Sequence, residues 1–212
     1  MIMSFPLIEY LTIIGIFSIG AISPGPDFAM VLRQSIIHGR KAGVFTSLGI
    51  ASAILVHGAY TILGLGIIIS QSLLLFSIVK YLGIAYLLYL GISALFAPAP
   101  EPSVNLSEKT NNISSTKSFT IGFLTNLLNP KAMLFFISLF TIIVSAATQA
   151  QFQAFYVFSM SIILFIWFTL VAIFFTTQKV RNGFYKLGKW FNRITGLALI
   201  ILAMRMAFFE NK

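Results

Sequence analysis

The stretch Ser23-Pro24-Gly25-Pro26-Asp27 interrupts the first long apolar run of the chain. Two prolines around a glycine cannot continue an α-helix, because each ring removes an N–H donor and drives the preceding residue out of the helical conformation. Asn129-Pro130-Lys131 interrupts a later apolar run, and Asn129 follows Ser23 by 106 residues, half of the 212 in the chain. Paired breaks in matching positions of two halves are typical of the binding site of a membrane transporter.

The composition indicates an integral membrane protein. The chain is 58% hydrophobic and only 9% charged, whereas soluble domains carry about 25% charged residues. We therefore expect a single membrane domain over residues 1–212, surrounded by lipid bilayer. The net charge of +9 does not indicate nucleic-acid binding, because the basic residues alternate with apolar runs and form no basic domain. The lack of cysteine excludes disulfides, thiol redox chemistry and cysteine-ligated metals.

Polar and charged interruptions divide the apolar sequence into segments that match the length of about 20 residues needed to span a bilayer. The six expected spans are Leu7–Asp27, Gly43–Ile69, Leu73–Phe96, Phe119–Ser145, Phe152–Thr176 and Ile194–Phe209. A polar, proline-containing linker at 97–118 separates a three-helix half (1–96) from a second three-helix half (119–212). The predicted fold is an all-α, multi-pass membrane protein with six transmembrane helices, of which the first and fourth are broken.

The basic residues predict the orientation. Ten of the fourteen fall in three alternating connections: the loop between spans one and two, the linker, and the loop between spans five and six. Because Lys and Arg accumulate in cytoplasmic loops, we expect these connections in the cytoplasm and both termini outside. With three spans in each half, the two halves would form inverted three-helix repeats, as in many alternating-access transporters.

The breaks also bring polar groups into the membrane. Ser23 and Asn129 are good N-cap residues, and the proline after each one suits the first position of a helix. Such half-helix N-termini attract anions, so a substrate carboxylate would suit one of them, and Lys131 adds a positive charge for the same task. Asp27, the only acid between residues 10 and 100, could hold a substrate amine or exchange a proton.

Each of these residues also has a purely structural interpretation. Asp27 could complement a helix dipole, Lys131 could extend toward the membrane surface, and Asn129 could only cap its helix. His57 is either a polar relay or a packed, hydrogen-bonded histidine. The small residues Gly43, Ser47 and Ala51, spaced by four, predict close helix packing, either within the chain or in a homodimer.

Several of these motifs together resemble the LysE/RhtB family of amino-acid exporters. The first half carries Ser23-Pro24-Gly25-Pro26-Asp27, Gly39-Arg40-Lys41-Ala42-Gly43, Leu48-Gly49-Ile50-Ala51 and Val56-His57, and the second half carries GFLTNLLNPKAMLFF over residues 122–136. The resemblance implies a secondary transporter in the bacterial cytoplasmic (inner) membrane that exports amino acids or their derivatives, coupled to protons. It implies neither an enzyme nor a cofactor, and it adds Asn126 to the expected site.

One position departs from the family pattern. Members often carry a polar residue three positions before the histidine, where this chain has Ile54. Three alternatives to an amino-acid exporter fit the sequence less well. Efflux of a small cation such as cadmium, known in the wider superfamily, would require more oxygen, imidazole or thiolate ligands than one acid and one histidine supply. A thiol–disulfide relay would require cysteine, and a scaffold protein would have no use for matched charges.

Overall fold

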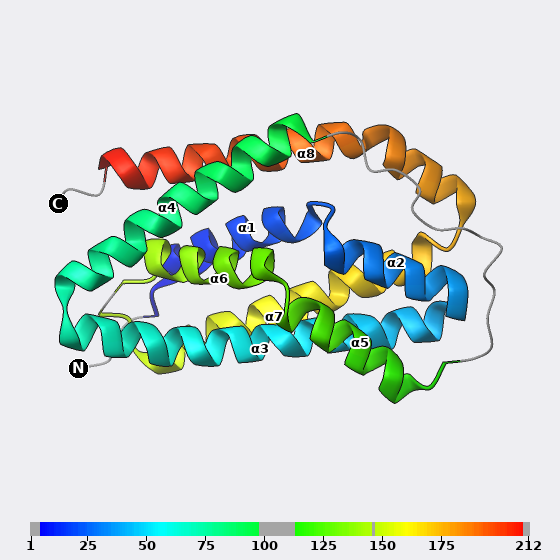
Figure 1. Ribbon diagram of the computed structural model, residues 1–212, viewed down its shortest axis with the longest axis horizontal. Helices are drawn as coiled ribbons and strands as arrows, with labels where there is room; N and C mark the ends of the chain where they lie inside the picture. Colours follow the sequence, from blue (N-terminus) through cyan, green and yellow to red (C-terminus); the bar gives the residue numbers. More distant parts are fainter. Residues whose placement is uncertain (1–4, 98–112, 146, 210–212) are drawn as a thin grey trace.

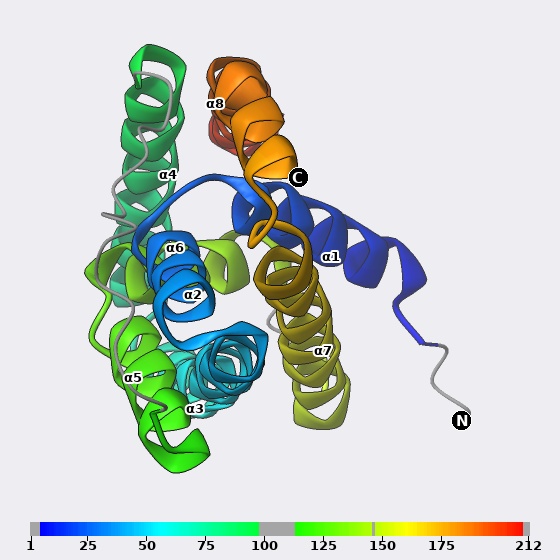
Figure 2. The ribbon, with the colours of Figure 1, turned by 90° about the vertical axis from the view of Figure 1, so that its right-hand side faces the viewer.

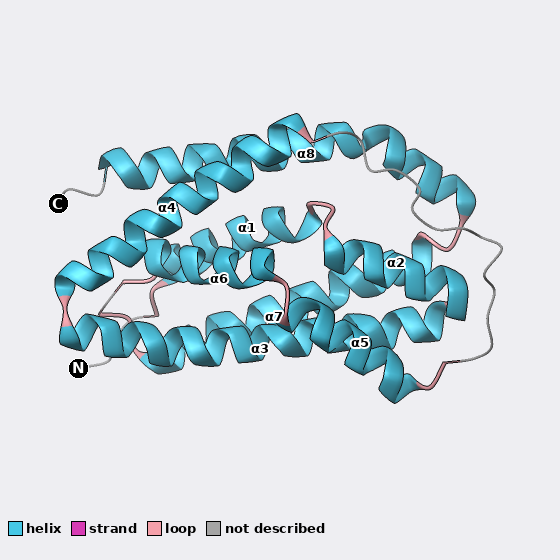
Figure 3. Cartoon of the chain, viewed as in Figure 1, coloured by secondary structure: helices cyan, strands magenta, loops and turns pink. Residues whose placement is uncertain are grey.

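The computed structural model describes residues 5–97, 113–145 and 147–209, and within these ranges every regular element is an α-helix (Figure 3). The helices are α1 Leu7–Ile22, α2 Pro26–His38, α3 Arg40–Gln71, α4 Leu73–Phe96, α5 Ser115–Leu127, α6 Pro130–Ile143, α7 Ala150–Phe174 and α8 Gln178–Phe209. Most of the predicted linker lies outside the described residues. The all-helical prediction is confirmed.

The helices have the length and composition of a multi-pass membrane protein. Four of them carry long apolar stretches, at Arg40–Gly64, Leu74–Phe96, Ala150–Phe174 and Leu187–Phe208. Two further helix pairs, α1 with α2 and α5 with α6, are apolar enough to span a membrane together and bend by 55° and 58° at their breaks. If each bent pair is one span, the described chain has six, as the sequence predicts.

The elements form an elongated bundle with both breaks near the middle of its long axis (Figure 1). The pair α1–α2 runs toward one end of the bundle, and the pair α5–α6 runs the opposite way; α3 and α7, and likewise α4 and α8, are also antiparallel (Figure 1). Viewed along the bundle, α4 and α8 lie side by side on one flank, while α3 and α5 lie together on the other (Figure 2). We call the end where α2 and α7 finish and α3, α5 and α8 start the basic end (Figure 1). The exposed Arg33 belongs to the second half of α2, Arg40 and Lys41 start α3, and Lys117 is in the first turn of α5.

The first break differs in detail from its prediction. Ser23 does not cap a new helix but ends α1, where its N–H donates to Gly20 O at 3.2 Å. The helix restarts at Pro26, with Gly25 as the N-cap. The reason is the second proline: residues before prolines avoid the helical conformation, so Ser23 (φ −61°, ψ 124°) and Gly25 (φ −160°, ψ −169°) are both extended.

The second break forms as predicted. Asn129 is the N-cap of α6, its side-chain Oδ1 accepts a hydrogen bond from Lys131 N at 3.0 Å, and Pro130 occupies the first helical turn. Asn129 is also extended (φ −80°, ψ 107°), as a residue before proline should be. A single proline therefore gives a shorter interruption than the Pro24–Pro26 pair.

The helix that contains the sixth expected span, α8, starts earlier than the sequence predicts. The basic segment before Ile194 was interpreted as a loop, but it is helical and forms the first part of α8, a helix of 32 residues. The charges of this segment argue against a membrane span, but they do not argue against a helix, since Lys and Arg are good helix formers. The gap expected between Ile69 and Leu73 is confirmed, since Ser72 caps α4 by accepting from Leu75 N. Gln149 lies in the gap expected between Ser145 and Phe152 and is the N-cap of α7.

Close helix contacts hold the two halves together. A Cβ at Gly122 of α5 would lie 2.0 Å from Thr46 O of α3, and one at Gly49 would lie 2.1 Å from Phe119 O. These positions therefore require glycine for the backbones to approach so closely. The stripe Gly43, Ser47 and Ala51 is buried inside the chain, where Gly43 packs on α2 and α7 and Ala51 O accepts from Ser161 of α7. The stripe is therefore a packing surface within the chain, and it gives no support to a homodimer.

Candidate functional site

A cavity of about 90 Å³ lies where the two breaks meet. On the same measure about 10–15 Å³ holds one water molecule, so the space accepts a small solute. Every helix contributes to its wall. Its lining is Phe17, Gly20, Ala21, Ser23, Gly25, Pro26, Asp27, Phe28, Ile54, Leu90, Ala94, Asn126, Asn129, Lys131, Ala132, Phe135, Phe136, Leu164, Phe168, Thr195 and Leu199. Of the predicted site residues, Pro24, Pro130 and His57 are not part of this lining.

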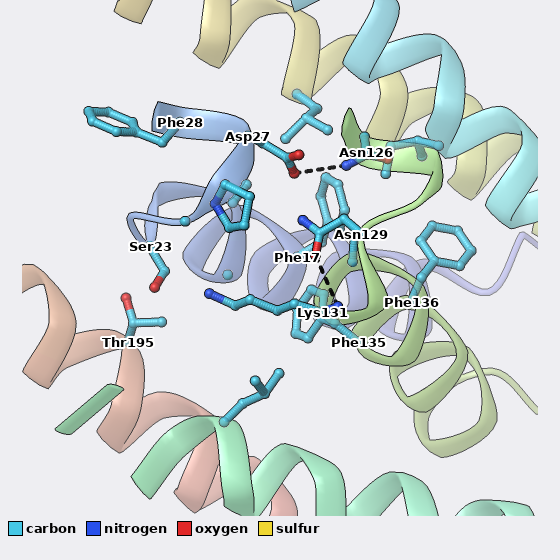
Figure 4. Close-up of a pocket in the computed structure, with 18 of the residues that line it drawn as sticks. Phe17, Ser23, Asp27, Phe28, Asn126, Asn129, Lys131, Phe135, Phe136 and Thr195 are labelled. Carbon is cyan, nitrogen blue, oxygen red and sulfur yellow. Dashed lines mark hydrogen bonds between the residues drawn. The ribbon is translucent and has the colours of Figure 1, made fainter. Parts of the chain in front are cut away.

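One hydrogen bond joins the two breaks directly. Asn126 Nδ2, in the last turn of α5, donates to Asp27 Oδ2, in the first turn of α2, at 2.8 Å (Figure 4). The Asn129 amide also faces this carboxylate (Figure 4). Asp27 Oδ1 and Asn126 Oδ1 are buried, and neither has a hydrogen-bond partner among the described residues. A buried acceptor without a partner costs about 1–3 kcal/mol, so a donor that reached either oxygen would lower that cost.

Lys131 supplies the opposite charge in the same cavity. Its side chain extends from the start of α6 across to the first break, where Nζ lies 3.5 Å from the position of a Cβ on Gly25 (Figure 4). Within the described ranges no salt bridge joins Lys131 to Asp27, so their charged atoms are more than 4.0 Å apart. The cavity thus presents a carboxylate and an ammonium group that face the same space without neutralising each other by direct contact.

His57 lies behind the cavity wall. It is fully buried on α3, and its Nε2 lies 3.3 Å from Asn126 O. A carbonyl oxygen can only accept, so Nε2 donates, and Nδ1 then accepts from Tyr60 OH. This bond fixes the end of α5 that carries Asn126. His57 therefore positions the break, while its predicted role as a polar relay stays a prediction.

The sequence did not reveal the remaining wall. Thr195 of α8 is buried and faces Ser23 across the cavity (Figure 4). Its only signal is that it is the one hydroxyl residue in the apolar stretch from Ile194 to Met204. Phe17 and Phe168 line the cavity as well, yet nothing in the sequence distinguishes them from other aromatic residues of the spans. Phe135 and Phe136 also line it; they end the motif at 122–136, but the motif did not predict that they face the site. Ile54 is 3% exposed and contributes to the apolar wall.

The helical bundle, its two broken helices and the cavity between them, which holds a carboxylate and an ammonium group, define a multi-pass membrane protein of the transporter class. The chain belongs to the LysE type translocator family, whose model matches residues 18–209. It is therefore a membrane transporter of that family, and the family resemblance of the sequence motifs is confirmed.

Known proteins of similar length cover nearly the whole chain. The threonine efflux protein of Escherichia coli (strain K12) is 32% identical over 199 residues, which cover 90% of this chain and 93% of the relative. The threonine efflux protein of Salmonella typhi is 31% identical over the same shares of both chains. The uncharacterized membrane protein YrhP of Bacillus subtilis (strain 168) is 30% identical over 197 residues, 90% of this chain and 94% of the relative. No solved structure is significantly similar to the chain.

Proposed function

We propose that the protein is a secondary transporter that exports amino acids or their derivatives across the bacterial cytoplasmic membrane. The family and the threonine efflux relatives support export of amino acids. In this proposal the substrate binds between the breaks, with its ammonium group at Asp27 and Asn126 and its carboxylate at Lys131. The transport step makes and breaks no covalent bond, so the protein needs no catalytic residue.

The observation that carries the proposal is the pair of unpartnered acceptors opposite Lys131. An α-ammonium group brings three N–H donors to a small volume, and Asp27 Oδ1 with Asn126 Oδ1 offer two buried acceptors for them. The carboxylate would then lie near Lys131 Nζ and the start of α2, whose N-cap Gly25 has no side chain to occupy the helix N–H groups. A helix N-terminus attracts an anion in addition to the lysine.

The same groups disfavour efflux of a small cation. Asp27 is the only acid in the cavity lining, and the ammonium group of Lys131 shares the space. No group of three metal-binding side chains occurs in the part of the chain that the structure describes. A divalent cation would meet one carboxylate and a repelling charge.

Coupling to protons and an inverted repeat complete the proposal. Asp27 Oδ1 is the atom that would exchange a proton when no substrate amine occupies it. Export would proceed as the halves rock around the site. The opposite chain directions of α1–α2 and α5–α6, of α3 and α7, and of α4 and α8 support the inverted relation (Figure 1). The basic end would face the cytoplasm, in accordance with the positive-inside rule.

Transport by purified protein in proteoliposomes tests the function. The twenty amino acids are loaded one at a time as radiolabelled substrates, threonine first because two relatives are threonine efflux proteins. A proton gradient should drive movement of at least one of them above the level of protein-free vesicles. If no amino acid moves, with or without the gradient, the proposal is wrong for unmodified amino acids, and the same assay with N-acylated and hydroxylated amino acids decides it for derivatives.

A further inference from the structure

A second cavity, of about 730 Å³, opens at the end of the bundle opposite the basic end. Its wall comes from α1, α6 and α8, three helices that also line the site at the breaks. It includes Glu9 and Thr12 of α1, Ile142 and Ile143 of α6, and Arg205 of α8. We call it the outer cavity and the space at the breaks the inner cavity.

The two linings follow one another along α1, α6 and α8, and on α6 and α8 they lie on the same helix face. On α1 the inner lining ends at Phe17 and the outer lining ends at Thr12, about 8 Å apart along the axis at 1.5 Å per residue. Residues three or four apart share a helix face. Ile13 is four residues from Phe17, Leu139 is four from Phe135, and Leu202 is three from Leu199, so all three continue the inner lining toward the outer cavity.

Ile13 and Leu139 lie between the two linings along α1 and α6, and Leu202 is the residue of the outer lining nearest to Leu199 of the inner lining along α8. Ile13 and Leu139 are 0% exposed and Leu202 is 7% exposed, and all belong to one buried apolar cluster. Along α1 the barrier between the two linings is therefore about one and a half helical turns of apolar side chain.

The two charged side chains that line the outer cavity, Glu9 and Arg205, differ in their hydrogen bonding. The carboxylate of Glu9 accepts from Ser145 N at 2.9 Å, Thr148 Oγ1 at 2.9 and 3.0 Å, and Tyr156 OH at 3.0 Å, so it fastens the start of α1 to the α6–α7 connection and to α7. Arg205 is exposed and makes no hydrogen bond or salt bridge with the described residues. Its guanidinium group is available to a carboxylate.

We propose that the outer cavity is the exit vestibule for the substrate, and that Ile13, Leu139 and Leu202 form the gate that closes the inner cavity toward it. A leaving amino acid would pass between α1, α6 and α8, and its carboxylate would meet Arg205 before it reaches bulk water. This inference rests on the proposed function for the identity of the substrate. The route itself can be tested without any substrate.

The lack of native cysteine makes labelling of single cysteines a direct test. Thr12→Cys reports on the vestibule and Leu11→Cys is the matched control, because Leu11 is 59% exposed on the same helix but lines neither cavity. Intact cells are treated with a small, membrane-impermeant methanethiosulfonate. A water-filled vestibule should make Thr12→Cys react about tenfold faster than Leu11→Cys, since thiol reaction requires access to water. Equal, slow rates in cells and in inverted vesicles would mean that lipid fills the cavity, and would overturn the proposal.

The gate is tested with a reporter in the inner cavity. Ala21→Cys lines that cavity and should react slowly from outside while the gate is closed. Adding Leu202→Ala should raise its labelling rate several-fold and leave the rate of Thr12→Cys unchanged, and the milder Ile13→Val provides the same test if Leu202→Ala does not fold. If neither change speeds labelling of Ala21→Cys, the gate assignment is wrong. Failure of the proposed function would instead appear as an absence of amino-acid transport with these labelling rates intact.

Discussion

Replacing Asp27 by asparagine removes one charge from the site and little else. The asparagine side chain is nearly isosteric with aspartate, and its amide oxygen could still accept the hydrogen bond that Asn126 Nδ2 donates to Asp27 Oδ2 at 2.8 Å. The contact between the two breaks should therefore survive. The change removes the anionic acceptor Oδ1, which has no partner in the described structure, together with the capacity to exchange a proton.

The expected loss follows from that single contact. A hydrogen bond to a charged group contributes about 1.5–3 kcal/mol, which corresponds to about a 10- to 150-fold change in affinity. If Asp27 binds the substrate ammonium group, Asp27→Asn should weaken binding by this factor and abolish export driven by a proton gradient. If Asp27 carries only the proton, gradient-driven export should be lost while exchange of substrate across the membrane, without a gradient, persists.

Proteoliposomes separate these outcomes when net export and substrate exchange are measured side by side. Glu9→Gln is the matched control, because it is also an acid-to-amide change on the first broken helix pair, but its carboxylate is already occupied by Thr148 and Tyr156. The control should retain the ratio of gradient-driven export to exchange. Full proton-dependent export by Asp27→Asn would refute the role of Asp27 and leave it as an acid that complements the dipole of α2.

Three further predictions concern Lys131, the two breaks and the orientation in the membrane. Lys131→Met should weaken substrate binding by about 10- to 150-fold through loss of a charge-assisted contact, measured by titration of the purified protein; unchanged affinity would remove Lys131 from the carboxylate site. Pro24→Ala combined with Pro26→Ala should permit a continuous helix and give a folded, inactive protein, and Pro130→Ala should act the same way; normal export with normal expression would make the breaks simple kinks. Thr110→Cys lies in the predicted cytoplasmic linker, outside the described residues, and should resist an impermeant thiol reagent in intact cells, so labelling from outside would reverse the orientation.

The sequence predicted the bundle well because the membrane imposes simple rules. Length, apolar composition and polar interruptions placed the ends of α4 at Leu73 and Phe96, where the structure has them. Prolines placed both breaks, because the effect of a proline on its predecessor is local. The prediction that Ser23 caps the second helix was wrong for the same local reason. Each proline keeps the residue before it extended, so both Ser23 and Gly25 lie outside the helices.

Which residues contact one another in the site could not be predicted from local sequence patterns. The bond between Asn126 and Asp27 joins residues 99 positions apart, and it depends on how α2 and α5 pack, which no local pattern encodes. Thr195 and the aromatic residues of the wall belong to apolar runs in which every position looks alike in sequence. Their selection depends on the rotation of each helix, set by tight contacts such as Gly91 of α4 against Gly196 O of α8.

The position of the site between the halves offers a reason for coupling binding to transport. Asp27 belongs to the first half of the sequence and Asn126 to the second, so a substrate ammonium group held by both unpartnered oxygens would bridge the two halves that move relative to each other in the proposed transport cycle. A ligand shifts a conformational equilibrium only by the difference between its affinities for the two states. If opening toward the outside separates Asp27 from Asn126, the substrate loses one of these two contacts. It then binds more weakly in the outward-open state, from which it is released. His57 would keep Asn126 with α3 during that movement, because its ring holds the backbone carbonyl of the same residue.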